Sequence, residues 1–554
     1  MTASPTLIVR NALIVDGTGQ PARPGSVAVT GDRITQVGQV QGSAAREIDA
    51  RGRVLAPGFI DIHTHYDPQL CWDRLATPSP EHGVTSLIMG NCSVTLAPVR
   101  PEHRARIIQL FGSVEDMESR LLEDTVPFQW RTYAEYVDYL RRDLGPNVGA
   151  FVGHAVIRLL VMGAAAQERA ATDAEIEAMC GELRAALRAG AFGLSFTYIH
   201  LDELGRELPC HYADMRELQA LFAVMAEEGR GMAEVAPPLM SGADVVCACI
   251  DRFGELASAT GVTCSISPLL QMPVFGDLWR RMLARFEHWQ ARGAPLYAQT
   301  QVRPGTSNMQ LARGSAGLSK GRHWRRLFEL PIPERIALLR DPSMRALLRE
   351  ETDTLPGARG LFVQRVQAVR NRKYEGRLVA DIAAAEDRPL FDVIADIALD
   401  DDLTAEFGQG GSVQADTGIV SQLLNHPGIH IGAGDAGAHI NQFAGAGDTC
   451  YLFEKFVREL GAMSLERAVH RLTGELAHRW NIADRGEIAP GRFADLVIFD
   501  PATIARGEEV WVQDVPGDNG RYVRHPQGIE QVIVNGEVLV DQGRYTTARP
   551  GRIL

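Results

Sequence analysis

Lysine is nearly absent from this chain. Only three of its 554 residues are lysines (Lys320, Lys373 and Lys455), and arginine supplies the other basic side chains apart from histidine. The formal net charge is −13, so the protein has no excess of positive charge with which to bind a polyanion. We therefore expect neither nucleic acid nor an anionic membrane as its principal partner.

Long apolar runs are also missing. No stretch approaches the roughly 18 apolar residues that a membrane-spanning helix requires, and residues 1–15 show no basic segment followed by a long apolar core. Eight cysteines are few for this length, and without a secretion signal they indicate reduced thiols. The sequence thus predicts a cytoplasmic protein with no membrane span.

Strand-rich segments stand at both ends of the chain. Residues 7–40 contain short apolar runs separated by glycine, proline and aspartate turns, and residues 529–546 contain the hairpin signal Asn535-Gly536. We expect residues 1–56 and 486–554 to form one small β-sandwich from the two termini.

Between these ends, apolar strand segments alternate with helical patterns. In residues 172–190, Thr172 and Glu175 form a capping box, apolar residues recur at helical spacing, and Gly190 is placed to end the helix. The strand segments are "VLAPGFIDI", "GVTSLIMG", "NVGAFVG", "AFGLSFT", "RGMAEV", "GVTCSIS", "APLYAQT" and "IHIGAGD". Eight of them predict an α/β fold, a (β/α)8 TIM-like barrel over residues 57–485, with its active site at the C-terminal strand ends.

A long stretch separates the seventh and eighth strand segments. It contains charged helical patterns such as "IPERIALLRDPSMRALLREE", and a structureless loop of this length would be unusual in a compact domain. We expect residues 304–415 to be a helical insertion that precedes the last barrel strand and covers the barrel mouth as a lid.

Metal-binding residue types follow three of the strand segments. In "GFIDIHTHYD", strand alternation places His63 and His65 on one face, and neutral imidazole is a common zinc ligand. Cys92 in "MGNCSVTLAPV" can supply a thiolate, although an ordinary buried thiol is the better explanation of this cysteine when it is taken alone. Asp435 in "IHIGAGDAGAH" can bind a metal and accept a proton from water. Together these residues predict a metal centre.

The motifs in combination resemble those of the amidohydrolase superfamily. "GFIDIHTHYD", "HGVTSLIMGNCSVTLAPV", "GDAGAH" and "DRGEIAPGRFADLVIFD" are similar to the D-aminoacylase, or N-acyl-D-amino-acid deacylase, branch, and the likeness runs over almost the whole chain. The resemblance implies a barrel that carries a β-sandwich, with zinc at the strand ends. It implies ligand roles for His63, His65 and Asp435, with Cys92 as the metal-binding cysteine.

The chain departs from that branch at the fifth and sixth strands, where the branch has histidines. The fifth strand offers Glu234, a candidate metal ligand that could instead pair with an arginine or bind substrate, and the sixth offers only Gln271, which suits hydrogen bonding. The branch's lysine after the sixth-strand histidine is also missing. A carboxylated lysine bridging two metals is excluded up to the seventh strand, because no lysine precedes Lys320. We favour one zinc ion, and leave two ions or another divalent metal open.

Other polar residues lie near the expected strand ends. His154 can stabilise a developing oxyanion, or it can be a structural histidine bonded to a loop. An arginine can bind a substrate carboxylate through its planar guanidinium group, or form a structural ion pair. The candidates for substrate contact are Arg158, Tyr198, Tyr297, Arg303 and His439.

The sequence predicts a metal-dependent hydrolase that cleaves an amide carbon–nitrogen bond. Asp435 would act as general base and then as general acid, and a bound metal would lower the pKa of water from about 15.7 to about 7. The resemblance implies an N-acyl-D-amino acid, a small carboxylate-bearing molecule, as substrate. A cyclic amide or carbamate substrate, a deaminase reaction and a degenerate barrel with a binding or scaffold role stay open, as does a homo-oligomer.

Overall fold

Eight parallel strands form the centre of the computed structural model, which describes residues 4–554 except 314–317, 319–320, 356–357 and 518. In chain order they are β6 (Phe59–Asp61), β7 (Val84–Met89), β8 (Asn147–Ala150) continued by β9 (Val152–Gly153), β10 (Gly193–Thr197), β11 (Met232–Ala236), β12 (Cys264–Ile266), β13 (Leu296–Thr300) and β17 (Ile429–Ile431). Each pairs in parallel with the next, and a parallel bridge from Thr64 to Ala436 joins the first to the last. The predicted α/β barrel is confirmed.

The first barrel strand is shorter than the sequence pattern indicated. The apolar run forms two strands, β5 (Val54–Pro57) in a separate sheet and β6 in the barrel. Gly58 stands between them because a Cβ there would lie 2.1 Å from Oγ1 of Thr85. His63 and His65 therefore follow the strand instead of alternating along it, which corrects that part of the prediction.

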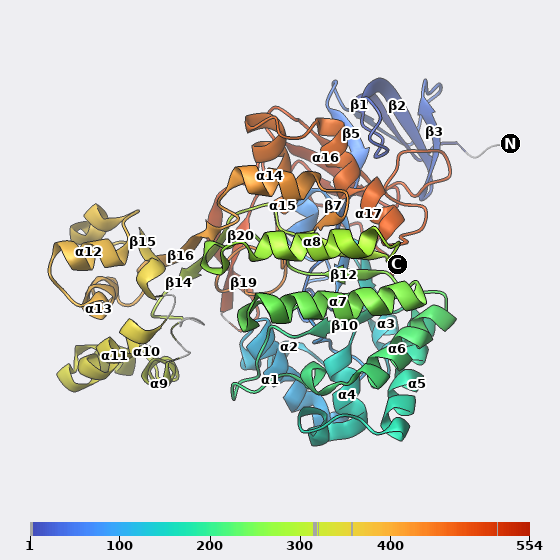
Figure 1. Cartoon of the computed structure of the whole chain (residues 1–554). Helices are drawn as coiled ribbons and strands as arrows, with labels where there is room; N and C mark the ends of the chain where they lie inside the picture. Colours follow the sequence, from blue (N-terminus) through green and yellow to red (C-terminus); the bar gives the residue numbers. More distant parts are fainter. Residues whose placement is uncertain (1–3, 314–317, 319–320, 356–357, 518) are drawn as a thin grey trace. The chain divides into compact units, whose positions relative to one another are not determined.

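Both ends of the chain contribute to one nine-stranded sheet. Its order is β23-β22-β21-β18-β5-β1-β2-β3, with β4 beside β1. Figure 1 labels β1, β2, β3 and β5 of this sheet. The other strands are β1 (Leu7–Ile14), β2 (Arg23–Thr30), β3 (Arg33–Gly38), β4 (Arg46–Asp49), β18 (Leu496–Phe499), β21 (Ile529–Val534), β22 (Glu537–Asp541) and β23 (Arg544–Tyr545). Its apolar core draws on both termini and includes Val9, Val29, Leu55, Leu496 and Ile533. Strands from both ends of the chain therefore share one sheet, while the β-sandwich of residues 1–56 and 486–554 stays a prediction.

Helices follow the barrel strands and cover them. Helix α5 (Asp173–Ala189) begins with the predicted capping box and ends at Gly190, whose φ is +109°. It buries Ile176, Met179 and Leu183, and burial of each such side chain contributes about 1.5–3 kcal/mol. The other helices of this unit are α1 (Arg104–Val114), α2 (Ser119–Thr125), α3 (Tyr133–Leu140), α4 (His154–Met162), α6 (Met215–Glu227), α7 (Ala243–Thr260), α8 (Leu278–Gln290), α14 (Thr417–Asn425), α15 (Asp448–Tyr451), α16 (Leu465–Leu472) and α17 (Gly474–Arg479).

Pro304–Ala415 and Asn441–Phe443 form a second compact unit. It contains an antiparallel sheet in the order β14-β16-β15 and its own apolar core, which includes Trp324, Phe391 and Phe407. Its elements are β14 (Gly305–Met309), β15 (Leu361–Arg365), β16 (Glu406–Val413), α9 (Arg322–Phe328), α10 (Ile332–Arg340), α11 (Pro342–Thr354), α12 (Val379–Ala385) and α13 (Leu390–Asp400). The role of this unit as a lid stays a prediction.

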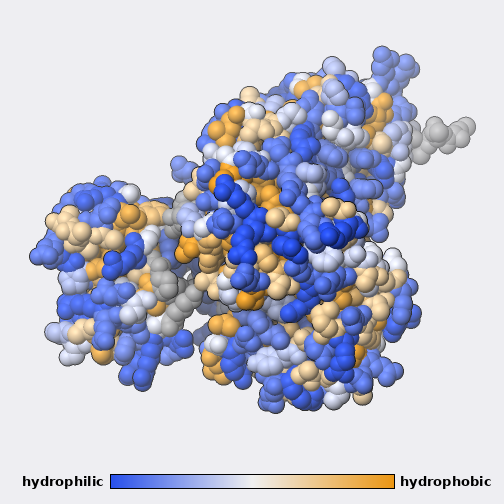
Figure 2. Space-filling model, viewed as in Figure 1, coloured by the Kyte–Doolittle hydropathy of each residue, from blue (hydrophilic) through white to orange (hydrophobic). Residues whose placement is uncertain are grey.

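Hydrophilic residues predominate on the face drawn in Figure 2, and hydrophobic residues occur there in scattered groups. Among the described residues, no helix has both the length and the apolar character needed to cross a bilayer. This finding agrees with the lack of long apolar runs in the sequence.

A buried polar network joins the nine-stranded sheet to the barrel. Asp495 accepts hydrogen bonds from the side-chain amide of Asn147 (3.2 Å) and the main-chain N–H of Asn535 (2.8 Å), and it pairs with Arg485. Asn147 begins β8, while Asp495 directly precedes β18. The network therefore fixes the third barrel strand against the sheet.

Replacing Asp495 with alanine should destabilise the protein by about 3–5 kcal/mol, because the Arg485 charge would stay buried without its carboxylate. Urea unfolding followed by tryptophan fluorescence measures the change. Glu47→Ala, which removes the ion pair with Arg10 at the surface, is the control and should leave the midpoint almost unchanged. Equal shifts for both variants would contradict the role of the network.

Candidate metal centre

Side chains that follow the first two barrel strands converge at the C-terminal end of the barrel. The ligand atoms of His63, His65 and Cys92 all lie within 4.8 Å of one another, and all three residues are buried. Asp435, which follows β17, reaches the same point. Its Oδ1 lies 3.2 Å from Nε2 of His63 and 3.6 Å from Nε2 of His65. The structure thus brings together the four donors that the sequence singled out.

Hydrogen bonds behind His63 determine which ring nitrogen faces the cluster. Its Nδ1 lies 3.1 Å from Oε1 of Gln299, and Nε2 of Gln299 donates to Oγ of Ser265 at 3.0 Å. Because the amide presents its oxygen to the ring, Nδ1 carries the proton and Nε2 is left to bind a metal. Gln299 stands at the end of the seventh strand segment, and this position is the one signal in the sequence that could have marked it as part of the site.

Glu115 holds the other histidine. Its Oε1 lies 3.1 Å from Nδ1 of His65, and the residue is only 1% exposed. Burial raises the pKa of Glu115, but the interaction with His65 is strong enough to hold that pKa below its ordinary value. Glu115 directly follows α1, far from any strand end, so no sequence motif marked it.

Glu234 lies beside the cluster on β11. Its Oε2 accepts the main-chain N–H of Cys92 at 3.0 Å, and its Oε1 lies 3.9 Å from Nδ1 of His63. The side chain is completely buried, and burial raises its pKa to about 7. Glu234 therefore orients the loop that carries Cys92. Gln271, by contrast, accepts the main-chain N–H of Asp416 at 3.4 Å.

The loops that carry the donors have an unusual backbone. Cys92, Ser93, Ala433 and Asp435 have φ values of +55°, +69°, +56° and +56°. The left-handed region costs a non-glycine residue about 1–3 kcal/mol and persists where the surroundings over-determine it, often at functional sites. The left-handed residues in these loops therefore reduce the stability of the folded protein.

The donor set suits a zinc ion. Two imidazole nitrogens, one thiol sulfur and one carboxylate oxygen match the tetrahedral preference of zinc. Burial lowers the pKa of His63, but Asp435 and Cys92 raise it well above its ordinary value. Burial raises the pKa of Asp435, but the two histidines hold it well below its ordinary value. The cluster thus favours positive charge. In the absence of a metal the protons on the histidines supply this charge, and a bound metal cation would supply it in their place.

Comparison with known proteins identifies the family. The model of the Amidohydrolase family matches residues 46–540. The chain belongs to the amidohydrolase family. This membership confirms the expected class of enzyme, a hydrolase that acts on carbon–nitrogen bonds other than peptide bonds.

Relatives of this amidohydrolase cover its whole length. The N-acyl-D-aspartate deacylase of Alcaligenes xylosoxydans xylosoxydans is 28% identical over 100% of this chain and 95% of its own. The D-aminoacylase of the same organism is 26% identical, with 99% and 97% covered. A solved N-acyl-D-glutamate deacylase from Bordetella bronchiseptica, complexed with zinc and a phosphonate that mimics the tetrahedral intermediate, is 26% identical, with a TM-score of 0.69 and both chains fully covered. The resemblance to the D-aminoacylase branch is confirmed.

Two further histidines lie around Glu115 in the amidohydrolase. The main-chain N–H of His439 donates to the main-chain oxygen of Glu115 at 2.9 Å. His200, after β10, interacts electrostatically with Glu115, His439 and His65, and burial lowers its pKa to about 4. Its ring is therefore neutral at neutral pH, and Nδ1 lies 2.7 Å from Oγ1 of Thr197. A neutral imidazole here can hydrogen-bond a substrate without adding charge.

His154 and Arg158 have partners away from the metal centre. The ring nitrogens of His154 lie 3.4 Å from Sγ of Cys210 and 2.6 Å from Oε1 of Glu217, and Arg158 pairs with the same carboxylate. Both side chains are fully buried. The structure therefore supports the structural alternative for each residue, and neither is retained as a contact to substrate.

The two tyrosine candidates also have internal partners. The hydroxyl of Tyr297 accepts a hydrogen bond from Arg479, and its ring stacks on His430 with 4.6 Å between centroids. Tyr297 stands two residues before Gln299 on β13, so it lies deeper in the barrel, toward the N-terminal end. The ring of Tyr198 packs against Phe253 of α7 with 6.1 Å between centroids. Neither residue is retained as a contact to substrate.

Arg303 supports the loop that carries Asp435. It pairs with Asp448 and donates to the main-chain oxygen of Gly434 at 2.9 Å. Gly434 directly precedes Asp435, so the guanidinium group braces this turn. The ion pair is the structural alternative that the sequence left open for Arg303.

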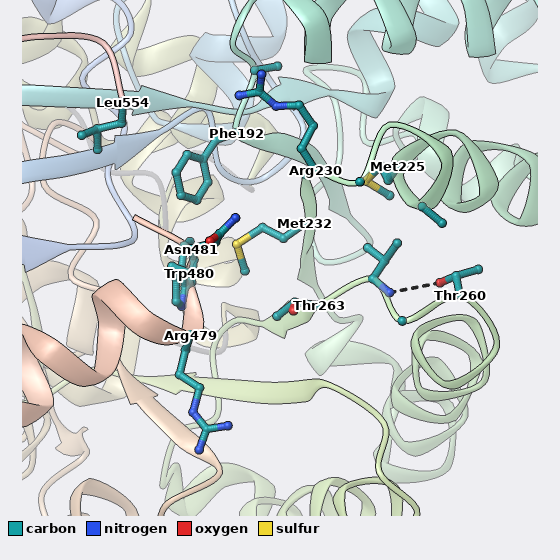
Figure 3. Close-up of a pocket in the computed structure, with 16 residues that line it drawn as sticks. Phe192, Met225, Arg230, Met232, Thr260, Thr263, Arg479, Trp480, Asn481 and Leu554 are labelled. Atoms are coloured by element: carbon teal, nitrogen blue, oxygen red, sulfur yellow. Dashed lines mark hydrogen bonds between the residues drawn. The ribbon is translucent and has the colours of Figure 1, made fainter. Parts of the chain in front are cut away.

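A separate cavity of about 340 Å³ lies at the opposite end of the barrel strands (Figure 3). The segments that line it, including residues 191–192, 229–231 and 260–263, precede β10, β11 and β12. Barrel enzymes carry their chemistry at the C-terminal strand ends, where His63 and Cys92 lie. The cavity is therefore not part of the metal centre.

Glu115→Gln should lower the affinity of this amidohydrolase for zinc about 10- to 100-fold, because a neutral amide orients His65 less firmly and makes it a weaker ligand. Competition with a chelator measures the dissociation constant. The control is Glu102→Gln at an exposed position, which should bind zinc as the wild type does. An unchanged dissociation constant for Glu115→Gln would show that Glu115 does not support the ligand.

Proposed function

We propose that this amidohydrolase removes the acyl group from an N-acyl-D-amino acid with the help of zinc held by His63, His65, Cys92 and Asp435. The observation that carries the proposal is the convergence of these four donors at the C-terminal end of the barrel. The relatives supply the substrate class, since their names describe deacylases of D-amino-acid derivatives. The intact donor set also argues against a degenerate barrel.

We propose one zinc ion in preference to two. Among the described residues, His63, His65 and Cys92 are the one group of three or more such donors that meets closely enough to hold a metal. Glu234 and Asp61 are further carboxylates near His63, but one oxygen of Glu234 is already occupied by the main-chain N–H of Cys92, and Asp61 accepts the main-chain N–H of His63. His63, His65 and Cys92 supply the three protein ligands that a catalytic zinc usually has, and the fourth position would go to water or to the Asp435 carboxylate.

Asp435 is placed to move protons during hydrolysis. Zinc, when bound, supplies a Lewis acid that makes water acidic near neutral pH and stabilises negative charge on the carbonyl oxygen. The Asp435 side chain is 31% exposed, whereas His63 and His65 are each 3% exposed, so its carboxylate reaches both the ligands and the open side of the centre. It takes a proton from the attacking water and then donates it to the leaving nitrogen.

Substrate contacts come from the residues around Glu115. We infer that His200 and His439 line the substrate side, since both lie near Glu115 and neither is fully buried.

We also infer a cytoplasmic location, because all eight cysteines are free, as thiols in a reducing compartment are.

Protein purified without chelator should contain about one zinc ion per chain and should hydrolyse N-acyl-D-amino acids faster than their L-enantiomers. Elemental analysis measures the metal, and detection of the released amino acid across a panel of acyl groups measures activity. Metal without activity on any member would end the deacylase assignment. A metal-free and inactive protein would contradict the metal centre itself.

Asp435→Asn should lower kcat about 10²- to 10⁴-fold, because an amide cannot accept the proton from water. Steady-state kinetics on the best substrate of the panel gives the value, and circular dichroism verifies the fold. Asp173→Asn, in a side chain that is 90% exposed on α5, is the matched control. A kcat near that of the wild type would remove Asp435 from proton transfer.

A further inference from the structure

A buried polar cluster behind the Cys92 loop has no part in the function described so far. Four separate segments contribute to it: the loop after β7, helix α4, the turn Pro209–Tyr212 and helix α6. All of its side chains are 0% exposed. Its members are Ser93, His154, Arg158, Cys210 and Glu217.

The cluster contains two acidic and two basic groups in a row. Arg158 and Nε2 of His154 both donate to Glu217, the latter at 2.6 Å, while Nδ1 of His154 lies 3.4 Å from Sγ of Cys210. Burial lowers the pKa of His154, but Cys210 and Glu217 raise it to about 9. Burial raises the pKa of Cys210, but His154 brings it below its ordinary value. Glu217 and Arg158 balance each other, so the cluster is neutral overall whether Cys210 and His154 are both uncharged or both ionised. The 3.4 Å contact between them and the opposite shifts of their pKa values favour a thiolate and an imidazolium.

Ser93 connects this cluster to the metal-binding loop. Its Oγ accepts the main-chain N–H of Ala155 at 2.8 Å and lies 3.1 Å from Sγ of Cys210. A thiolate at Cys210 can only accept, so Ser93 donates to it in that state. Its main-chain N–H donates to Oγ of Ser195 at 3.0 Å. Ser93 directly follows Cys92, and both residues have left-handed backbone. The side chain of Ser93 therefore fixes the loop on the side opposite the metal ligands.

Cys210 resembles the nucleophile of a cysteine–histidine–carboxylate site in its hydrogen bonds, but its burial gives it another role. Because the residue has no exposed surface, a substrate cannot reach the sulfur. The negative charge of Cys210 can still act on its neighbours. A hydrogen bond from Ser93 to a thiolate is about twice as strong as one to a neutral thiol. The paired charges also cannot separate without leaving a buried ion alone, which is costly.

We propose that Cys210 and His154 form an ion pair that anchors Ser93 and thereby holds Cys92 in the position from which it binds the metal. Cys210, His154 and Ser93 are positioning residues in this scheme, and the proposal rests on the metal centre proposed above. The anchor offsets the cost of the left-handed backbone at Cys92 and Ser93. It also explains why the strained loop stays in place.

Zinc affinity and the ultraviolet charge-transfer band of the cadmium-loaded protein test the link, because the band reports a thiolate bound to the metal. Ser93→Ala and Cys210→Ala should each lose about 10- to 100-fold in zinc affinity and should show a weaker band. Cys210→Ser keeps a polar atom for both neighbours but not the negative charge, so it should recover little of the loss, and full recovery would overturn the role of the ion pair. Cys450→Ala, at another fully buried free cysteine, is the matched control and should bind zinc as the wild type does.

A double-mutant cycle separates positioning from general loss of packing. If Cys210 acts through Ser93, the double variant should lose no more zinc affinity than either single variant, whereas independent effects would add. Additive losses, or wild-type affinity in folded Ser93→Ala, would overturn the proposal. Ser93→Ala keeps the charged cluster, so it decides the matter if Cys210→Ala does not fold. Wild-type protein without zinc affinity would refute the metal centre and not this link.

Discussion

The meeting of the first and last barrel strands is the constraint on which the rest of this structure depends. The main-chain N–H of His65 donates to the oxygen of Ala436 at 2.8 Å, and Thr64 bridges the same residue. In the same few residues, Oδ1 of Asp435 reaches both imidazoles. Closure of the barrel and assembly of the donor set are therefore one event, and an ion that binds the closed form must also stabilise the fold.

Negative charge behind the histidines gives the centre its preference for a cation. Glu115 lies against His65, and Asp435 lies against both rings, while Glu234 is buried close to His63. In water such pairs would contribute little, but burial strengthens each interaction and penalises any charge left unpaired. The same buried carboxylates therefore destabilise the folded protein without metal and stabilise it when a metal ion is bound. Left-handed residues at Cys92 and Asp435 add to that cost.

The sequence was informative where chemistry coincides with a strand end. The eight strand segments and the four donors could be predicted because each is a local pattern, and barrel geometry alone then brings the strand ends together. Glu115 could not be predicted, because its approach to His65 depends on how the loop after α1 folds. The alternatives for Arg158 could not be separated for a related reason: its partner Glu217 is 59 residues away, and no local pattern encodes that pairing. For Tyr297, strand alternation correctly predicts the face of β13 on which the side chain lies. It does not predict how far along the strand, between the N-terminal and C-terminal ends of the barrel, that side chain is.

The unusual residues on the fifth to seventh strands make physical sense as a group. Glu234 accepts the N–H of Cys92, Gln299 presents its oxygen to His63, and Ser265 accepts from the amide of Gln299. β11, β12 and β13 are adjacent in the sheet, so three neighbouring strands support ligands that belong to the first two. Polar groups that could have held a second ion instead fix the ligands of the first. Ligands held in this way need little reorganisation when the ion binds, which favours one well-defined site over two weaker ones.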